Sequence, residues 1–314
     1  MQEVLYTLSP VFLIIATGAC LRKFNFFTDN AIEQLKRLAY WVGLPSYLFI
    51  ELSEGYKLTE SAVDMLTIFM IATVCTIILL YIIAKVLKIE TWRIGTFVQL
   101  GFRGNFAYVG LPVVYFAYLN GGACSAEAHS AQKLAALGLG AAVVVYNILA
   151  VTFLLASRHG LSAKALPRIF KNILTNPLLV SSALGIAWSL TGVDVPRPFP
   201  QTFRLLGKLA LPVALLCVGG SLISTPIKGN ILAPTITSIV KTFICPAIGF
   251  LTAICLGTEN QGAKIAVILL ATPTSVGSFV LTSQLKGDSH LASAGIVLST
   301  LLSLVSLGLA VALV

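Results

Sequence analysis

Charged side chains are scarce in this sequence. Asp, Glu, Lys and Arg make up 11% of its 314 residues, whereas a soluble domain carries about 25%. Hydrophobic residues make up 57%, and the mean hydropathy is +0.93. The apolar stretches run without interruption for about 20 residues, the length that an α-helix needs to cross a bilayer. The period-2 alternation of transmembrane β-strands does not occur, so the sequence predicts an all-α polytopic membrane protein.

Residues that build metal and catalytic centres are also few. The six cysteines are scattered without a CxxC pair and are expected to be small buried hydrophobes. His129, His159 and His290 fall at span ends or in loops, without a partner at metal-ligand spacing. Ser275 has no His or Lys at a catalytic spacing, so an enzyme would need a partner from elsewhere in the fold. We expect no metal, no cofactor and no enzymatic activity.

Acidic residues are missing from the centres of the apolar stretches. Glu51 and Asp64 flank a connecting loop. A proton relay or a sodium cage built from carboxylates is therefore not expected. Coupling to an ion would depend on carbonyl and hydroxyl ligands, on Lys241, or on protonation of the substrate, and a uniporter is the alternative.

Ten apolar stretches are predicted to span the membrane. They cover residues 4–21, 34–52, 63–87, 93–117, 129–156, 173–191, 203–224, 232–256, 263–284 and 290–313. With the N-terminus outside, the inner side would carry thirteen Lys and Arg residues and the outer side six. The positive-inside rule then places both termini outside and the 157–172 loop in the cytoplasm. The net charge of +9 is explained by these helix ends, so we expect an inner (plasma) membrane location and no nucleic-acid partner.

The two halves of the chain resemble each other. A shift of 167 residues superposes ordered Pro and Gly positions, namely Pro10 on Pro177, Leu44-Pro45 on Leu211-Pro212, and Val109-Gly110 on Val276-Gly277. The alternative is that ten apolar helices match by composition alone. We predict a first five-helix repeat over 1–156, a linker over 157–172 and a second repeat over 173–314. Since five is odd, the second repeat is inverted, as in secondary transporters.

The fourth and ninth stretches are interrupted near their centres. The fourth contains Arg103, Gly104 and Asn105, and the ninth contains Thr272-Pro273-Thr274-Ser275. A break exposes backbone polar groups, which are tolerated in a membrane only beside protein or a water-filled cavity. A half-helix that begins there presents N–H groups and a partial positive charge. Asn105, Thr272, Thr274 and Ser275 are expected to cap those N–H groups or to bind substrate. Paired breaks therefore predict an anion site, most simply for a carboxylate.

Individual side chains at the breaks have alternative roles. Arg103 would hold a substrate carboxylate or would stabilise the end of the first half-helix. Lys241 would be an anion ligand, a substitute for a transported cation, or a lysine that snorkels or pairs with a carbonyl. Tyr108, one turn beyond Asn105, would line the site or pack. The complete predicted substrate site is Arg103, Asn105, Phe106, Tyr108, Lys241, Thr272, Pro273, Thr274 and Ser275.

Four motifs resemble the auxin efflux carrier family, which includes plant auxin exporters and bacterial carriers of malonate and similar acids. They are GNFAYVGLP, TNPLLVSSALG, LGKLALPVALLCVGGSL and ATPTSVGSFVLTSQ. The resemblance covers the whole chain. It implies the fold of the bile-acid/sodium symporters, with ten transmembrane helices in two inverted five-helix repeats and broken, crossing helices 4 and 9. It also implies a scaffold of spans 1, 2, 6 and 7, a mobile transport domain, a substrate beside the crossover, and a homodimer.

The chain departs from the plant members of that family. They carry Asn-Pro at both breaks, whereas this sequence has Asn105-Phe106 and Thr272-Pro273, and bacterial members often have a polar residue where Gly277 stands. Their long cytoplasmic loop is absent. We therefore predict a secondary transporter that moves a small organic acid, rather than auxin, by elevator-like alternating access. A channel or uniporter for a neutral or other small solute is the alternative.

Overall fold

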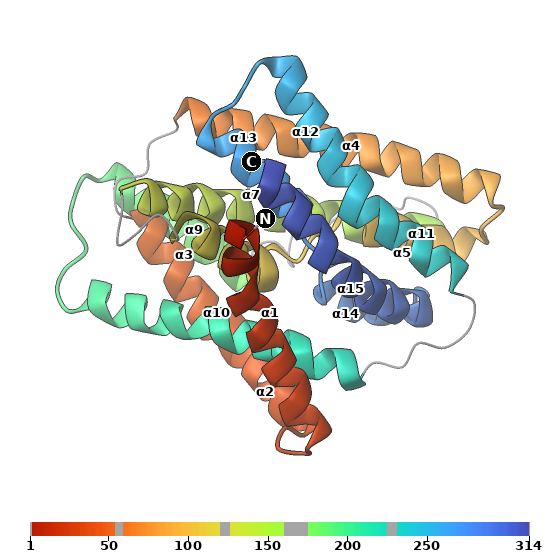
Figure 1. Ribbon diagram of the computed structural model, residues 1–314, viewed down its shortest axis with the longest axis horizontal. Helices are drawn as coiled ribbons and strands as arrows, with labels where there is room; N and C mark the ends of the chain where they lie inside the picture. The colour runs from red at the N-terminus through yellow and green to blue at the C-terminus, as the bar shows by residue number, and fades with distance from the viewer. Residues whose placement is uncertain (1, 54–58, 120–125, 160–174, 225–230, 314) are drawn as a thin grey trace. The chain divides into compact units, whose positions relative to one another are not determined.

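In a computed structural model of the chain, residues 2–53, 59–119, 126–159, 175–224 and 231–313 are described (Figure 1). Regular structure within them is helical, apart from one isolated bridge between Gly104 and Thr274. The predicted all-α class is confirmed. The helices are α1 (Gln2–Lys23), α2 (Asp29–Leu38), α3 (Leu44–Ser53), α4 (Glu60–Val86), α5 (Thr91–Phe102), α6 (Leu111–Leu119), α7 (Ala126–His159), α9 (Pro177–Leu190), α10 (Phe199–Ser224), α11 (Leu232–Ile239), α12 (Cys245–Leu256), α13 (Gln261–Leu270), α14 (Gly277–Gln284) and α15 (Ser289–Leu313), with π-turns η1 (Ala39–Gly43), η2 (Phe106–Gly110) and η4 (Val240–Ile244).

Several helices are suited to a membrane. Among the described residues, five stretches are long and apolar enough to cross one, namely Glu60–Val86, Glu127–Ser157, Phe199–Ile223, Leu232–Leu256 and Ser289–Leu313. Large apolar side chains on α4 face outward, with Ile78 54% and Val86 74% exposed, as lipid contact requires. These features fit a multi-pass membrane protein. The count of ten spans, their inverted repeat and the orientation of the termini stay predictions, and the predicted 157–172 loop lies from residue 160 onward outside the described residues.

The chain divides into two compact units that interleave along the sequence. Unit 1 comprises Met1–Val63, Ala107–Val143 and Leu174–Ser224, and unit 2 comprises Asp64–Phe106, Val144–Ile173 and Thr225–Val314. Unit 1 thus contains α1, α3, α9 and α10, as expected for the scaffold. The division differs from the expected one in the fourth and fifth spans, since α6 and the first half of α7 also belong to unit 1.

Within unit 1, α10 crosses α1 at very close range (Figure 1). The approach depends on glycine. A Cβ atom built on Gly219 would lie 1.8 Å from the carbonyl oxygen of Ile15, and one on Gly18 would lie 2.1 Å from that of Leu216. Small residues allow membrane helices to pack backbone against backbone in this way.

We expect the Gly219→Ala substitution to destabilise the protein. The added methyl meets backbone atoms, which cannot move aside, so overpacking should cost about 2 kcal/mol and outweigh the better helix propensity of alanine. The measurement is the Tm of the purified protein in detergent. The control is Leu205→Ala, because Leu205 lies on the same helix with 69% of its surface exposed. An unchanged Tm for Gly219→Ala would contradict the close crossing.

Three spans contain a π-turn immediately before a proline. Pro45, Pro112 and Pro246 are each the second residue of the α-helix that follows a π-turn. In η1 and η4 the widened turn is closed by bonds to the fifth preceding carbonyl, from Leu44 N to Ala39 O and from Cys245 N to Val240 O. Proline lacks the N–H donor and its ring crowds the carbonyl four residues back. The wider turn accommodates that ring while the helix continues.

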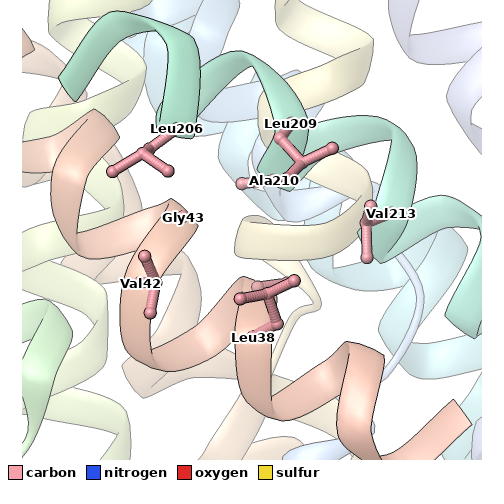
Figure 2. A pocket seen from close by; sticks show the side chains of 8 residues that line it. Leu38, Val42, Gly43, Leu206, Leu209, Ala210 and Val213 are labelled. Carbon is pink, nitrogen blue, oxygen red and sulfur yellow. The ribbon is translucent and has the colours of Figure 1, made fainter. Parts of the chain in front are cut away.

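A small apolar hollow lies beside η1 in unit 1. Figure 2 shows Leu38, Val42 and Gly43 on one side, with Leu206, Leu209, Ala210 and Val213 of α10 on the other. Its volume is about 20 Å³, little more than one water molecule needs. The hollow has no polar side chain, so it is unsuited to an organic acid.

Candidate functional site

The two predicted breaks pair with each other inside unit 2. α5 ends at Phe102 and α13 ends at Leu270. The extended residues that follow exchange backbone hydrogen bonds, from Asn105 N to Pro273 O at 2.7 Å and from Ser275 N to Arg103 O at 2.8 Å. Gly104 and Thr274 form the antiparallel bridge between them. The pairing satisfies backbone groups that a broken helix would otherwise leave unpaired in apolar surroundings. The crossing of two complete spans stays a prediction.

Gly104 occupies a position where no side chain fits. A Cβ atom there would lie 2.2 Å from Cε1 of Phe106 and 2.7 Å from Oγ1 of Thr272. The bridge brings the two backbones together at this residue. A glycine between Arg103 and Asn105 is therefore a steric requirement of the paired breaks.

The threonine hydroxyls at the breaks bond differently from the expectation. We expected Thr272 and Thr274 to cap N–H groups or bind substrate. Instead, Thr272 Oγ1 donates to the carbonyl of Leu269 at 2.6 Å, and Thr274 Oγ1 donates to the carbonyl of Leu100 at 2.7 Å. Both carbonyls belong to the last turn of a half-helix, where α-helical N–H donors run out. The Thr274 hydroxyl supplies a donor to Leu100 O, and the Thr272 hydroxyl adds a donor to Leu269 O, which also accepts from the Thr272 amide at 3.2 Å.

The Arg103 guanidinium lies beside the start of α14. Its Nη2 donates to Asn147 Oδ1 on α7 at 2.7 Å. The same nitrogen lies 3.5 Å from the position of a Cβ atom built on Gly277, the first residue of α14, and Ser275 Oγ is equally close to that position. A fixed cation, a hydroxyl and the first turn of a helix thus converge. Since helix N-termini also favour negative charge, the arrangement suits an anion.

A buried polar cluster joins α5 to α14 close to the Arg103 break. Gln99 Nε2 of α5 donates to Thr282 Oγ1 at 2.5 Å and to the Ser278 carbonyl at 3.4 Å, and all three residues are fully buried. Within the described part of the chain, Gln99 Oε1 and Ser278 Oγ have no hydrogen-bond partner. Buried polar atoms of this kind usually find water or a ligand. They are candidate contacts for a polar group on the substrate.

Sequence reasoning missed Gln99, Asn147 and Ser278. Gln99 precedes Arg103 by four residues and Ser278 follows Ser275 by three, and these spacings place residues on one helix face. That spacing could have identified both. Asn147 lies 44 residues from its partner Arg103, so no local pattern indicates it.

Four other predicted site residues have different surroundings. Phe106 is 2% exposed and packs against Phe69 and Tyr146, with ring centroids 5.1 and 5.6 Å apart. Pro273 is buried and contributes its carbonyl to Asn105, which is also buried. Tyr108 belongs to unit 1, where its hydroxyl lies 3.5 Å from the Lys36 carbonyl. The structure therefore brings Arg103, Asn105, Pro273, Thr274 and Ser275 together, and Phe106 supports them as a packed aromatic ring.

Lys241 is fully buried in the π-turn η4 of unit 2. Its Nζ donates to the carbonyl of Leu270, the last residue of α13, at 2.5 Å. Of the roles considered for it, a snorkelling lysine is excluded because the side chain has no exposed surface. Lys241 thus bonds to the C-terminal end of α13, immediately before the second break.

The acidic residues nearest the spans also differ in part from the expectation. Glu51 lies in the last turn of α3, next to the connection, and is only 7% exposed. Asp64 lies in α4 and accepts a hydrogen bond from Asn260 Nδ2 at 2.6 Å. Among the described residues, no group of three or more His, Cys, Asp or Glu side chains could hold a metal ion.

Comparison with known proteins gives consistent similarities. The profile of a family described as membrane transport protein matches residues 3–165 and 161–311. An uncharacterized transporter of Methanocaldococcus jannaschii is 20% identical over 306 residues, 95% of each chain. A putative malonate transporter of Rhizobium meliloti is 30% identical over 139 residues, 43% of this chain and 42% of the relative. Auxin efflux carrier component 7 of Arabidopsis thaliana is 24% identical over 143 residues, 43% of this chain but 23% of the longer relative.

Proposed function

Since this chain belongs to the membrane transport protein family that includes the auxin efflux carriers, we propose that it is a secondary transporter of a small organic anion, most simply a carboxylate. The observation that carries the proposal is the Arg103 guanidinium beside the first residue of α14. A carboxylate there would meet a charged donor and the N–H groups of a helix start.

The chemistry of the similar proteins supports the same substrate class. One relative is described as a putative malonate transporter and others as auxin efflux carriers, and both names denote carboxylic acids. In this chain Ser275 Oγ lies near the same point as the guanidinium, and the buried polar side chains of Gln99 and Ser278 follow on α5 and α14. Such a shell favours a small carboxylate over a large aromatic acid.

Alternating access would use the two units of the chain. The hydrogen bonds described for the paired breaks join residues of unit 2. The anion would therefore be held by one compact unit, which could move as a body while the site keeps its geometry. This is an elevator-like mechanism with a substrate site at a pair of broken helices.

The first test is ligand binding by the purified protein. Small mono- and dicarboxylates are screened for a rise in Tm, because a ligand that binds only the folded state stabilises it. We expect a dicarboxylate to raise the Tm, and the Asn105→Ala variant to lose most of that rise. Asn105 joins the two breaks through its backbone, and its side chain is buried.

The control for this test is Asn176→Ala. Asn176 is also a buried asparagine, but it caps α9 in unit 1 through Oδ1 bonds to the Leu178 and Leu179 amides. Its loss should lower the basal Tm by the cost of a helix cap, about 1 kcal/mol, while the ligand-induced rise stays. If no carboxylate binds, or if neutral solutes bind equally well, the anion proposal is wrong.

A further inference from the structure

Two buried atoms between α5 and α14 have hydrogen-bonding capacity that the described part of the protein does not use. Gln99 Oε1 and Ser278 Oγ have no hydrogen-bond partner among the described residues, although both residues are 0% exposed. A buried polar atom of this kind costs stability unless water or a ligand bonds to it. The two atoms therefore form a candidate binding site, and their chemistry limits which group the site can hold.

The orientation of the Gln99 amide is fixed by its neighbours. Its Nε2 donates to the Ser278 carbonyl at 3.4 Å and to Thr282 Oγ1 at 2.5 Å. A carbonyl oxygen can only accept a hydrogen bond, so the amide nitrogen must face it and the amide oxygen must point elsewhere. Exchanging the two would set two acceptors against each other. Gln99 Oε1 is thus an acceptor that requires an O–H or N–H group from its ligand.

Ser278 supplies the complementary group, because its hydroxyl has a hydrogen to donate. An undissociated carboxyl group carries one O–H donor and one carbonyl acceptor. These match the Gln99 acceptor and the Ser278 donor. An ionised carboxylate has acceptors only, so it would leave Gln99 Oε1 without a donor and would place negative charge against that oxygen. The pair therefore favours a neutral carboxyl group over an ionised one.

The pair lies close to the guanidinium that is proposed to hold the anion. Gln99 and Arg103 are four residues apart, and their side chains reach consecutive residues of α14. The Gln99 amide bonds to Ser278, and Arg103 Nη2 lies 3.5 Å from the Cβ position of Gly277. Residues four apart on a helix are about 5–6 Å apart at Cβ, a distance that a dicarboxylic acid of about three or four carbons can span.

We propose that Gln99 Oε1 and Ser278 Oγ form a subsite for an undissociated carboxyl group, so that the substrate is a short dicarboxylic acid bound as its monoanion. The inference rests on the proposed function, since Arg103 would hold the ionised carboxylate of the same molecule. Each substrate molecule would carry one proton on its second carboxyl group. That proton is taken from the solution on one side of the membrane and released on the other.

The protein's own titratable groups must be separated from this effect. α14 and α11 have none, and Cys75, Tyr81 and Lys85 of α4 are exposed. The others on the elements around the subsite are Arg93 and Arg103 of α5, Lys241 of η4, Tyr146 of α7, and Asp288 and His290 at the start of α15. Of these, Asp288 and His290 have ordinary pKa values in the acidic to neutral range. They belong to the protein, so they affect every ligand of a matched series alike.

The experiment compares ligands that differ only in the group beyond the ionised carboxylate. The probes are malonic and succinic acids, the monoamide and the monomethyl ester of each, and 3-hydroxypropionate. The monoamide offers an N–H donor and does not ionise, the monomethyl ester has no donor, and 3-hydroxypropionate offers an O–H donor. The Kd of each is measured by calorimetry on purified wild type, at pH values from below to above the second pKa of the diacid.

We expect the affinity for the diacid to fall about tenfold per pH unit above its second pKa, because one proton is bound with it. The monoamide should show no such fall, and the ester should bind at least about tenfold more weakly than the monoamide. Diacid affinity that is constant or rises in this range, or an ester that binds as tightly as the monoamide, overturns the subsite and leaves the anion site intact. Tighter binding of 3-hydroxypropionate than of either diacid assigns the subsite to a hydroxyl group and also overturns the proposal. If no ligand of the series binds, the subsite and the proposed anion site both fail.

Ser278→Ala tests the subsite from the side of the protein. It removes a buried hydroxyl without a partner among the described residues, and alanine favours the helix, so the Tm of the ligand-free protein should not fall. Affinity for the diacid below its second pKa should fall about fivefold. The matched control is Ser283→Ala, an exposed serine of the same helix, which should bind as wild type does. Equal diacid affinity in Ser278→Ala and Ser283→Ala overturns the proposal.

Gln99→Met is the second variant, because methionine has a similar length but no acceptor oxygen. The preference for the monoamide over the ester should shrink to about twofold or less. A preference as large as that of wild type would show that Gln99 Oε1 does not accept the donor, which overturns the proposal. The ligand series on wild type needs neither variant, so it decides the question even if both unfold.

Discussion

Replacing Arg103 by glutamine is expected to lower uptake of the organic anion about 100-fold, which corresponds to about 3 kcal/mol of lost binding. Arg103 ends α5, and its guanidinium lies between Asn147 and the first residue of α14. Glutamine keeps a hydrogen-bond donor but removes the charge. The measurement is uptake of radiolabelled carboxylate into proteoliposomes, together with the ligand-induced rise in Tm. Lysine at this position should recover only part of the loss, since it lacks the planar fork that matches a carboxylate.

The matched control is Arg93→Gln on the same helix. Arg93 forms an ion pair with Asp288, with Nε 2.7 Å from Oδ2, and its side chain is 29% exposed. Its loss should cost about 1 to 3 kcal/mol of stability, because Asp288 is only 10% exposed, and should leave uptake within about twofold, because the pair lies at the other end of α5 from the paired breaks. Equal loss of uptake in both variants would show that any arginine on α5 matters, and the assignment of Arg103 to the anion would be wrong.

The second large effect is expected for Gly104→Ala. A methyl group at this residue would overlap the Phe106 ring and the Thr272 hydroxyl, at 2.2 and 2.7 Å. Relief requires the packed Phe106 ring and the Thr272 side chain to move, which should disturb the adjacent bonds from Asn105 N to Pro273 O and from Ser275 N to Arg103 O. We expect loss of uptake and a stability loss of about 3 kcal/mol, at the upper end for overpacking. Tm and uptake are measured on the same preparation.

Gly277→Ala serves as the stability control for this substitution. Its added methyl would lie 3.5 Å from Arg103 Nη2 and from Ser275 Oγ, which is ordinary contact distance. The Tm should therefore stay within a degree or two of wild type. A Gly104→Ala protein as stable as Gly277→Ala would contradict the close pairing of the two breaks.

Sequence patterns predicted the location of the breaks but not their hydrogen bonds. Arg103 to Asn105 and Thr272 to Ser275 interrupt apolar runs. A polar or helix-breaking residue inside such a run can be recognised from the sequence alone. The direction of each threonine hydroxyl is not, because carbonyl and N–H groups at a break lie equally close along the chain. Thr272 and Thr274 were expected to cap N–H groups or bind substrate, and both are found to donate to carbonyls.

Contacts between residues far apart in the sequence also could not be predicted. Asn147 and Arg103 are 44 residues apart, and Lys241 and Leu270 are 29 residues apart. Neither pair shares a helix, so helical spacing says nothing about them. The role of Phe106 in the substrate site stays a prediction. Its ring also packs against Phe69 and Tyr146, two distant residues that no local pattern indicates.

The π-turn before Pro246 changes the angular positions of the side chains around the axis of the span formed by α11 and α12. Successive residues of an α-helix are about 100° apart, so Ile239 and Leu251 would lie about 120° apart on an uninterrupted helix. One extra residue in η4 subtracts about 100° and brings the two within about 20° of each other. Both are in fact exposed, at 41% and 60%, as are Leu232 and Ile254 at 57% and 60%. The inserted residue therefore keeps the exposed apolar side chains of α11 and α12 on one continuous face, while Lys241 lies on the opposite face.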